Sequence, residues 1–490
     1  MRKAIDFEDD VTKPIPMDRR EGPVTMGLLW ITMVTAFPTL LIGFEWFKNG
    51  LSLTQVISCC ALSCLMLLCY AIPATQLGAR TGLGYSALSR SIFGRWGARF
   101  VTFNVIWMFV CFYGLMSFLM AESLSGIFHW TVPIAVLSAV FALIMSVNNL
   151  FGFKGVANFA RYIAAPALIM WVGYSFIKSC SMCPSTVLTQ TSPVTFVTAL
   201  TTVSSFVIGY AVWGNEMDYW KHGRPKTTDS AMPLTVALIV GQILFPVTGW
   251  MVARVTGITE YGAASALMTN FSFGGVALLA SVVLGASYFA ANDSNLLGSV
   301  QACENLKPLR HQTWAMILAL AGATCAAAFS ALGAAKSIES IACLNCIIMP
   351  TPTVIMLGEW LLMSKIWKQG TISSVTVPSF SELPAVRWAA VIALGSALTV
   401  GLLTSGVIPG MEKFQFGIAS VQTWLTALFV YIPLRVWERR LELARRTSTY
   451  FSERAVPIPI ALSIAEAGRM SESMQLSVPL QLPASEHSVH

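Results

Sequence analysis

Charged side chains are scarce in this chain. Asp, Glu, Lys and Arg make up 11% of its 490 residues, against 55% for apolar residues, whereas about 25% of the residues of a soluble domain are charged. This composition excludes an ordinary soluble domain and predicts a multi-pass membrane protein embedded in a lipid bilayer. The net charge of +7 indicates topology rather than nucleic-acid binding, because the charges lie in short loops and tails.

Catalytic and metal-binding patterns are also missing. The chain has only five histidines, none in the middle of an apolar segment, and no Ser/His/Asp set, metal-ligand cluster or phosphate-binding loop lies within such a segment. We therefore expect no enzyme activity and no cofactor. Most of the eleven cysteines lie in apolar segments, where a thiol packs as a small hydrophobe. Cys180 and Cys183 lie in a predicted outside loop, and their spacing leaves open whether they pair.

Apolar segments long enough to cross about 30 Å of hydrocarbon predict an all-α fold with twelve transmembrane helices. They lie near 24–46, 54–74, 99–127, 133–150, 156–178, 197–217, 231–255, 274–299, 313–334, 338–363, 388–409 and 415–436. With the N-terminus inside, most of the 31 lysines and arginines face the cytoplasm, so we expect both termini there and a location in the cell membrane. The twelve-helix domain, 24–436, separates a tail at 1–23 from a partly disordered tail at 437–490.

Two of these helices contain residues that break helices. Pro38 falls in the middle of the first helix and should break it at about Phe37. Gly209 and Gly214 interrupt the sixth helix. Broken membrane helices leave backbone groups free to bind substrates and ions. Breaks at these two places are what an inverted five-plus-five repeat predicts, with repeats at 24–178 and 197–363 and two further helices at 388–436.

Several dispersed motifs give the chain a family resemblance. They are Gly78-Ala-Arg-Thr-Gly-Leu83, the segment from Gly214 to Arg224 with Asp218-Tyr-Trp-Lys, Asn292-Asp293, and Ile348-Met-Pro-Thr-Pro352. Together they resemble the nucleobase:cation symporter-1 family, nearest its cytosine and purine–cytosine permease branch, from about residue 20 to about 435. The resemblance implies a LeuT-type fold and import of a nucleobase or a related small ring compound in symport with sodium or protons.

The resemblance also implies a substrate site. An aromatic ring of the substrate needs a π-face to stack on, and its polar edge needs amide groups in fixed positions. The positions that match the family's site are Phe37, Phe112, Gly209, Tyr210, Trp213, Asn215, Ser287, Asn292 and Asn295. Packing or anchoring at the membrane interface is the alternative for Tyr210 and Trp213. Phe109 departs from the pattern, since the permeases have a hydrogen-bonding Gln there.

The coupling ion is a second departure. Sodium-coupled members use two adjacent hydroxyl side chains in the eighth helix, and Ala290 and Ala291 occupy those positions here. A hard cation requires oxygen ligands, and carbonyls near Met33 and Ala36 alone make a poor cage. This favours a proton over sodium. Its carrier would be Asp293, with Glu216 in reserve, and a purely structural role is the alternative for Asp293.

The sequence thus predicts a secondary transporter that imports cytosine, a purine or a similar small heterocycle, with a proton as the coupling cation. Two alternatives stay open. One is an allantoin- or hydantoin-type transporter, and the other is an amino-acid or amine transporter of the same fold, with sodium as the coupling ion in either case.

Overall fold

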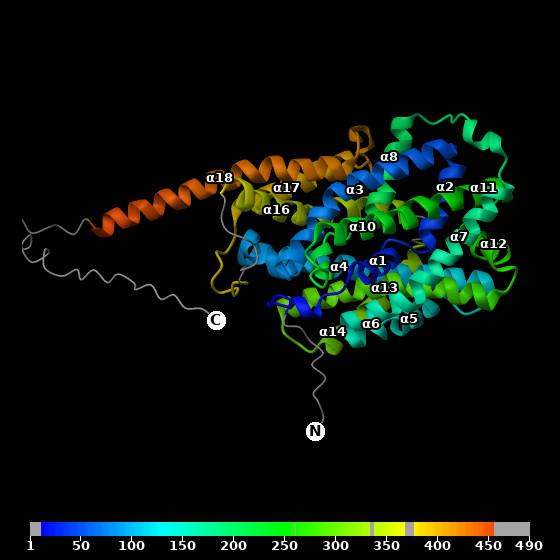
Figure 1. The fold of residues 1–490 in the computed structure, drawn as a ribbon, viewed down its shortest axis with the longest axis horizontal. Coiled ribbons are helices and arrows are strands. Elements are labelled where there is room, and N and C mark those ends of the chain that lie inside the picture. The colour runs from blue at the N-terminus through cyan, green and yellow to red at the C-terminus, as the bar shows by residue number, and fades with distance from the viewer. Residues whose placement is uncertain (1–10, 260, 334–337, 368–376, 455–490) are drawn as a thin grey trace, which may run out of the picture. The chain divides into compact units, whose positions relative to one another are not determined.

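The helices are described here from a computed structural model, which describes residues 11–259, 261–333, 338–367 and 377–454 (Figure 1). The chain divides into two compact units, Met1–Arg435 and Val436–His490. The described part of the second unit is the C-terminal part of helix α18. The described residues form helices, loops and one isolated β-bridge between Glu21 and Gly223.

The described part of the first half of the chain contains eight α-helices, with two 3-10 turns (η2, and η4 at Ser185–Thr189) and a π-helical turn (η3) between some of them. Their bounds are α1 Pro23–Met33, α2 Phe37–Lys48, α3 Leu53–Thr81, α4 Tyr85–Phe128, α5 Ile134–Met145, η2 Asn148–Phe151, α6 Gly152–Phe159, η3 Ala160–Ala164, α7 Ala165–Met182 and α8 Phe196–Ala211.

The described residues of the second half form ten further α-helices and two further π-helical turns (η5 and η7). Their bounds are α9 Glu216–Trp220, α10 Thr227–Leu238, η5 Ile239–Leu244, α11 Phe245–Thr256, α12 Tyr261–Phe273, α13 Ala277–Leu306, α14 His311–Leu332, α15 Ile338–Ile348, α16 Pro350–Leu361, η7 Leu362–Ile366, α17 Trp388–Thr404 and α18 Ala419–Arg454.

Each predicted membrane segment contains one or more of these helices. Within the part of the chain that the structure describes, six helical stretches are long and apolar enough to cross a membrane, and the count is up to eight if each of two bent pairs is one span. The bent pairs are α1 with α2, at 50°, and α12 with α13, at 113°, while α8 and α17 are shorter apolar helices. The fold is therefore helical with several apolar spans, and the number twelve and the inverted repeat stay predictions.

Three helical segments lie outside the predicted spans. Helix α12 was not predicted, because its polar residues interrupt the apolar pattern. The connector before the third predicted helix is itself helical from Tyr85, and only Gly94, with φ of 75°, departs from helical geometry. The tail predicted to be partly disordered begins as helix, since α18 continues to Arg454. Residues 455–490 lie outside the described residues.

Helix α13 is the structural centre of the first unit. It packs along α4, and it also contacts α1, α2, α7 and α14 (Figure 1). From Ala290 to Cys303 every residue of α13 is buried, including the polar Asn292, Asp293 and Asn295. Around this centre α1 packs on α10, α2 on α11, and α8 on both α3 and α15. Polar groups on α13 consequently face protein rather than lipid.

The segment before α1, which we call the N-terminal strap (residues 15–22), binds two loops. The Ile15 amide donates to the Gly82 carbonyl at 3.0 Å, and the Glu21 amide donates to the His222 carbonyl at 2.7 Å. Arg20 donates to the carbonyl oxygens of Ile15 and Ala79. The strap therefore ties the loop after α3 to the loop after α9.

Asp218, which belongs to one of the motifs on which the family resemblance rests, binds the start of α4. Its carboxylate accepts a hydrogen bond from the Tyr85 amide at 2.8 Å, at the first turn of α4. Free amides at a helix N-terminus favour a negative charge. Asp218 thus holds the start of α4 against α9.

Candidate functional site

The first break lies between α1 and α2, at residues 34–36. Pro38, in the first turn of α2, cannot continue the hydrogen bonding of α1, as the sequence predicted. The freed groups find partners nearby. The Val34 carbonyl accepts from the Gln242 amide at 2.6 Å, and the Phe37 amide donates to the Ser287 hydroxyl at 3.3 Å. Ser287 therefore connects α13 to the break.

The second break lies between α8 and α9, at residues 212–215. One oxygen of the Glu216 carboxylate accepts from the Trp213 and Gly214 amides at 3.0 and 3.1 Å. Its other oxygen accepts from the Tyr70 hydroxyl at 2.7 Å. The Asn345 amide donates to the Gly209 and Val212 carbonyls at 2.7 and 3.1 Å. Glu216 thus caps the break, and its lone pairs are engaged by protein donors.

The two glycines of this helix have different roles. Gly214 has φ of 75°, which L-residues rarely adopt, and a Cβ there would lie 2.4 Å from the Met349 carbonyl oxygen. Gly209 does not break the helix, contrary to the prediction, because α8 continues to Ala211. A Cβ on Gly209 would lie 2.0 Å from the Ala342 carbonyl oxygen, so it permits close packing of α15.

Aromatic rings stand beside both breaks. At the first break, the fully buried Phe37 ring lies 5.9 Å from Trp171 and 6.5 Å from Tyr288, centroid to centroid. At the second break, the Trp213 ring lies 5.4 Å from Phe109. Phe109, which replaces the expected Gln, therefore extends an aromatic wall on α4.

The other predicted rings are also on these elements. Phe112 lies on α4, one turn beyond Phe109, and is 8% exposed. Tyr210 stacks on Phe206 at 5.4 Å, and its hydroxyl lies 3.9 Å from the Met116 sulfur. The indole nitrogen of Trp213 is buried and has no hydrogen-bond partner among the described residues. It is a donor at the second break, as recognition of a polar ring edge requires.

The predicted amides bind protein groups in this structure. Asn292 donates to the Tyr113 carbonyl at 3.0 Å and to the Ser117 hydroxyl at 2.9 Å, which joins α13 to α4. Asn295 donates to the Asn292 side-chain oxygen at 3.3 Å. Asn215 donates to Asp218 at 2.8 Å and so belongs to the start of α9.

Asp293 faces the turn between α5 and α6. Its carboxylate accepts from the Asn148 amide at 2.7 Å and from the Asn149 amide at 3.3 Å. The Asn149 carbonyl in turn lies 3.0 Å from a ring nitrogen of His311, whose other ring nitrogen lies 2.7 Å from Glu304. The sequence did not predict the residues of this network other than Asp293.

The positions expected for a sodium site are buried around the first break. Met33, Ala36, Ala290 and Ala291 are each no more than 3% exposed. The Ala36 carbonyl accepts from the Thr39 amide at 2.9 Å and from the Thr39 hydroxyl at 2.7 Å. Within the described ranges, no three His, Cys, Asp or Glu side chains are grouped to hold a metal ion.

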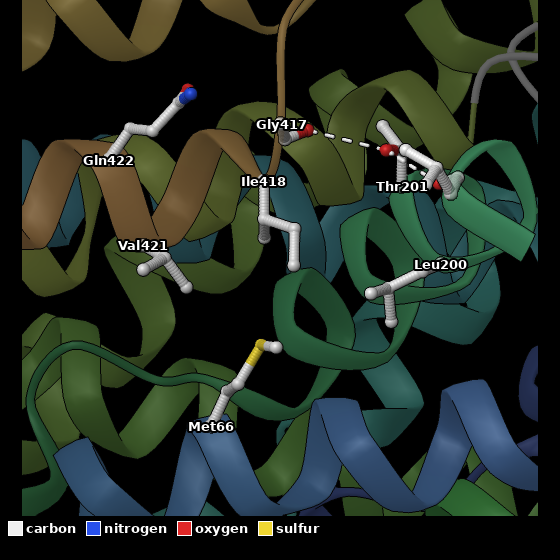
Figure 2. Close-up of a pocket in the computed structure, with 8 residues that line it drawn as sticks. Met66, Leu200, Thr201, Gly417, Ile418, Val421 and Gln422 are labelled. Carbon is white, nitrogen blue, oxygen red and sulfur yellow. Dashed lines mark hydrogen bonds between the residues drawn. The ribbon is translucent and has the colours of Figure 1, made fainter.

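A cavity of about 350 Å³ lies elsewhere, between α3, α8 and the start of α18 (Figure 2). The apolar side chains of Met66, Leu200, Ile418 and Val421 are among those that line it. Its polar lining is slight, and the Thr201 hydroxyl already donates to the Gly417 carbonyl at 3.4 Å. A heterocycle needs several polar partners, so the two breaks are the better candidate site.

Residues 14–415 match the family model described as permease for cytosine/purines, uracil, thiamine, allantoin. The chain belongs to this family. The predicted membership of the nucleobase:cation symporter-1 family is thereby confirmed, and the family and its structural neighbours are transporters rather than enzymes. A comparison with curated proteins found no match.

Solved structures share the fold at low sequence identity. Mhp1, a nucleobase-cation-symport-1 family transporter solved in a closed conformation with bromovinylhydantoin, has a TM-score of 0.70 and 18% identity over 88% of this chain and 96% of its own. A Na⁺-coupled sialic acid symporter has a TM-score of 0.57 and 12% identity over 86% of this chain and 90% of its own. A manganese transporter of Eremococcus coleocola has a TM-score of 0.54 and 15% identity over 88% of this chain and 99% of its own.

Sequence reasoning missed the side chains that support the breaks. Gln242 and Asn345 hold carbonyls at the first and second break, and Tyr70 holds Glu216. Trp171 and Tyr288 cover Phe37. The two amides were discoverable, since polar side chains inside apolar segments are costly unless partnered. The rings were not, because one Trp among apolar residues carries no distinguishing pattern.

Proposed function

We propose that this family member imports a nucleobase or a related small heterocycle by cation symport, with the substrate bound between the two helix breaks. The observation that supports this most is the pair of aromatic walls, Phe37 with Trp171 and Phe109 with Trp213, one at each break. Rings stack on flat heterocycles, and the free indole donor of Trp213 suits a polar ring edge.

The alternatives differ in what they require of the site. An amine substrate needs an anion at a break, and the Glu216 carboxylate there already accepts three hydrogen bonds from protein groups. An allantoin- or hydantoin-type ring stays the alternative to a nucleobase, because Phe109 stands where the permeases have a hydrogen-bonding Gln.

Uptake competition separates these substrate classes. Purified transporter in proteoliposomes would be given radiolabelled cytosine, hypoxanthine, allantoin and a hydantoin in turn, each with the others and an amino acid as competitors. We expect saturable uptake of a heterocycle that other planar rings inhibit and amino acids do not. Uptake of an amino acid that heterocycles leave unchanged would overturn the proposal.

Stacking should dominate substrate affinity. Aromatic contacts add about 0.5–1.5 kcal/mol each beyond burial, so Phe112→Ala, which also removes buried apolar surface, should raise the apparent Kd roughly tenfold. Phe112→Trp should be tolerated. Phe128→Ala on the same helix is the control, since Phe128 is 37% exposed. If Phe112→Ala and Phe128→Ala bind the substrate equally well, Phe112 is not in the pocket.

We further propose that a proton couples to transport and that Asp293 carries it. The Asn149 side-chain oxygen is buried without a hydrogen-bond partner among the described residues. A proton on the Asp293 carboxyl would supply a donor to that oxygen once the amide rotates. The carboxylate also lies in a buried part of α13, where a charge is costly and a proton removes the cost.

Asp293→Asn tests the proton carrier. Asn mimics the protonated carboxyl permanently, so we expect substrate exchange across proteoliposomes to continue while accumulation driven by a pH gradient is lost. Asn148→Asp, which places a second carboxyl in the same turn, should slow both processes. Accumulation by the unmodified protein under a sodium gradient at equal pH on both sides would contradict proton coupling, whatever the variants did.

We propose that the transporter lies in the cell membrane and that both of its termini are in the cytoplasm. The support is the distribution of Lys and Arg between alternate loops. We expect a reporter fused to the C-terminus to be found on the cytoplasmic side of the membrane. A reporter found outside the cell would reject the twelve-helix arrangement.

A further inference from the structure

Two cysteines lie against one methionine where the end of α7 packs on α11. Cys180 lies in the last turn of α7, Cys183 directly follows that helix, and Met251 comes from α11. The Cys180 sulfur lies 4.0 Å from the Met251 sulfur, and the Cys183 sulfur lies 3.9 Å from the Met251 carbonyl oxygen. Both cysteines are free thiols in this structure.

The separation of the Cys180 and Met251 sulfurs suits ligands of one metal ion. Metal–sulfur bonds are about 2.3 Å long, so two sulfurs bound at a trigonal angle lie about 4.0 Å apart. Two residues between the cysteines let both thiols turn to the same side of the helix end. Thiolate and thioether sulfurs are soft ligands that select Cu(I) over hard cations.

Access and charge at this place also suit a metal ion. Cys180 is exposed and Cys183 is half-buried, whereas Met251 is 3% exposed and forms the floor behind them. Burial and the neighbouring Cys180 raise the pKa of the Cys183 thiol, and the positive charge of Arg254, one turn from Met251, partly offsets this rise. An ion can therefore arrive from solvent, and the positive charge helps to offset the negative charge that two thiolates bring.

We propose that Cys180, Cys183 and Met251 form a binding site for a soft monovalent metal ion of the Cu(I) class. Each cysteine binds as a thiolate and releases its proton, and the thioether of Met251 binds without releasing one, so no oxidation or reduction occurs. Because the ligands come from two helices, the bound ion links the end of α7 to α11. The site is independent of the substrate proposed for the helix breaks.

The direct test is Cu(I) binding to the purified full-length transporter in detergent, under anaerobic conditions and in competition with bicinchoninate. We expect one Cu(I) per chain at this site. Cys180→Ser and Cys183→Ser should each weaken binding at least a hundredfold, and Met251→Leu about tenfold. Met182→Leu, which changes an exposed methionine between the two cysteines, and Cys69→Ser, which removes an exposed thiol on α3, should leave binding unchanged.

Two further readouts separate this site from its alternatives. X-ray absorption at the copper edge should show three sulfur neighbours, and two in Met251→Leu. Equal Cu(I) affinity in the unmodified protein and in a Cys180→Ser/Cys183→Ser double variant would overturn the proposal. So would a Met251→Leu affinity equal to that of Met182→Leu, or a Cys180–Cys183 disulfide in protein taken directly from membranes.

Discussion

Replacement of Gly214 by Ala is expected to abolish transport and to lower the melting temperature of the protein markedly. A left-handed backbone costs an L-residue about 1–2 kcal/mol, and the new Cβ would lie 2.4 Å from the Met349 carbonyl oxygen, an overpacking of about 1–3 kcal/mol. The strain falls on the break between α8 and α9, so the aromatic rings beside that break would shift. Thermal unfolding in detergent and uptake in proteoliposomes measure the two effects.

Gly395→Ala is the matched control. Gly395 lies in α17, and a Cβ there meets no atom within 4 Å, so this variant should keep the melting temperature and the uptake rate of the unmodified protein. If Gly214→Ala behaves like Gly395→Ala in both measurements, the backbone at the second break does not require glycine.

Removal of the Glu216 side chain is expected to be nearly as damaging. Glu216→Ala leaves the Trp213 and Gly214 amides and the Tyr70 hydroxyl without their acceptor, and each buried orphaned donor costs about 1–3 kcal/mol. We expect loss of uptake together with a lower melting temperature, because both follow from collapse of the break.

Two milder variants separate the capping role of Glu216 from a role in coupling. Glu216→Gln keeps one oxygen for the two amides, so it should fold and still accumulate substrate under a pH gradient. Tyr70→Phe removes only one of the three donors and should lie between Glu216→Ala and the unmodified protein in stability. A Glu216→Gln variant that folds and exchanges substrate but no longer responds to a pH gradient would make Glu216 the proton carrier.

Local chemistry made the breaks predictable. Pro38 removes a donor wherever it stands inside a helix, and the structure places a 50° bend immediately before it. Gly214 among polar residues marked the second break, because few other residues allow a positive φ. Gly209 was misread for the same reason. Glycine also serves close helix packing, and only the position of Ala342 on α15 decides between the two roles.

Long-range partners were not predictable from one sequence. The carboxylate of Asp293 meets Asn148 and Asn149 from a turn about 145 positions away in the chain, and no periodicity reports such a pairing. Helix α12 was missed because its 13 residues are too few to cross a membrane and its Ser, Thr and Asn side chains interrupt the apolar pattern. The apolar segments themselves were visible, since the cost of exposed backbone in lipid forces each of them to be helical.

The N-terminal strap has a practical consequence for protein production. Residues 15–22 precede the first apolar residue of α1, so an expression vector trimmed to the membrane helices would delete them. Such a deletion removes the hydrogen bonds to Gly82, Ala79 and His222 and leaves two loops without their shared tether. An affinity tag for purification should therefore be placed ahead of residue 15 and should not replace the strap.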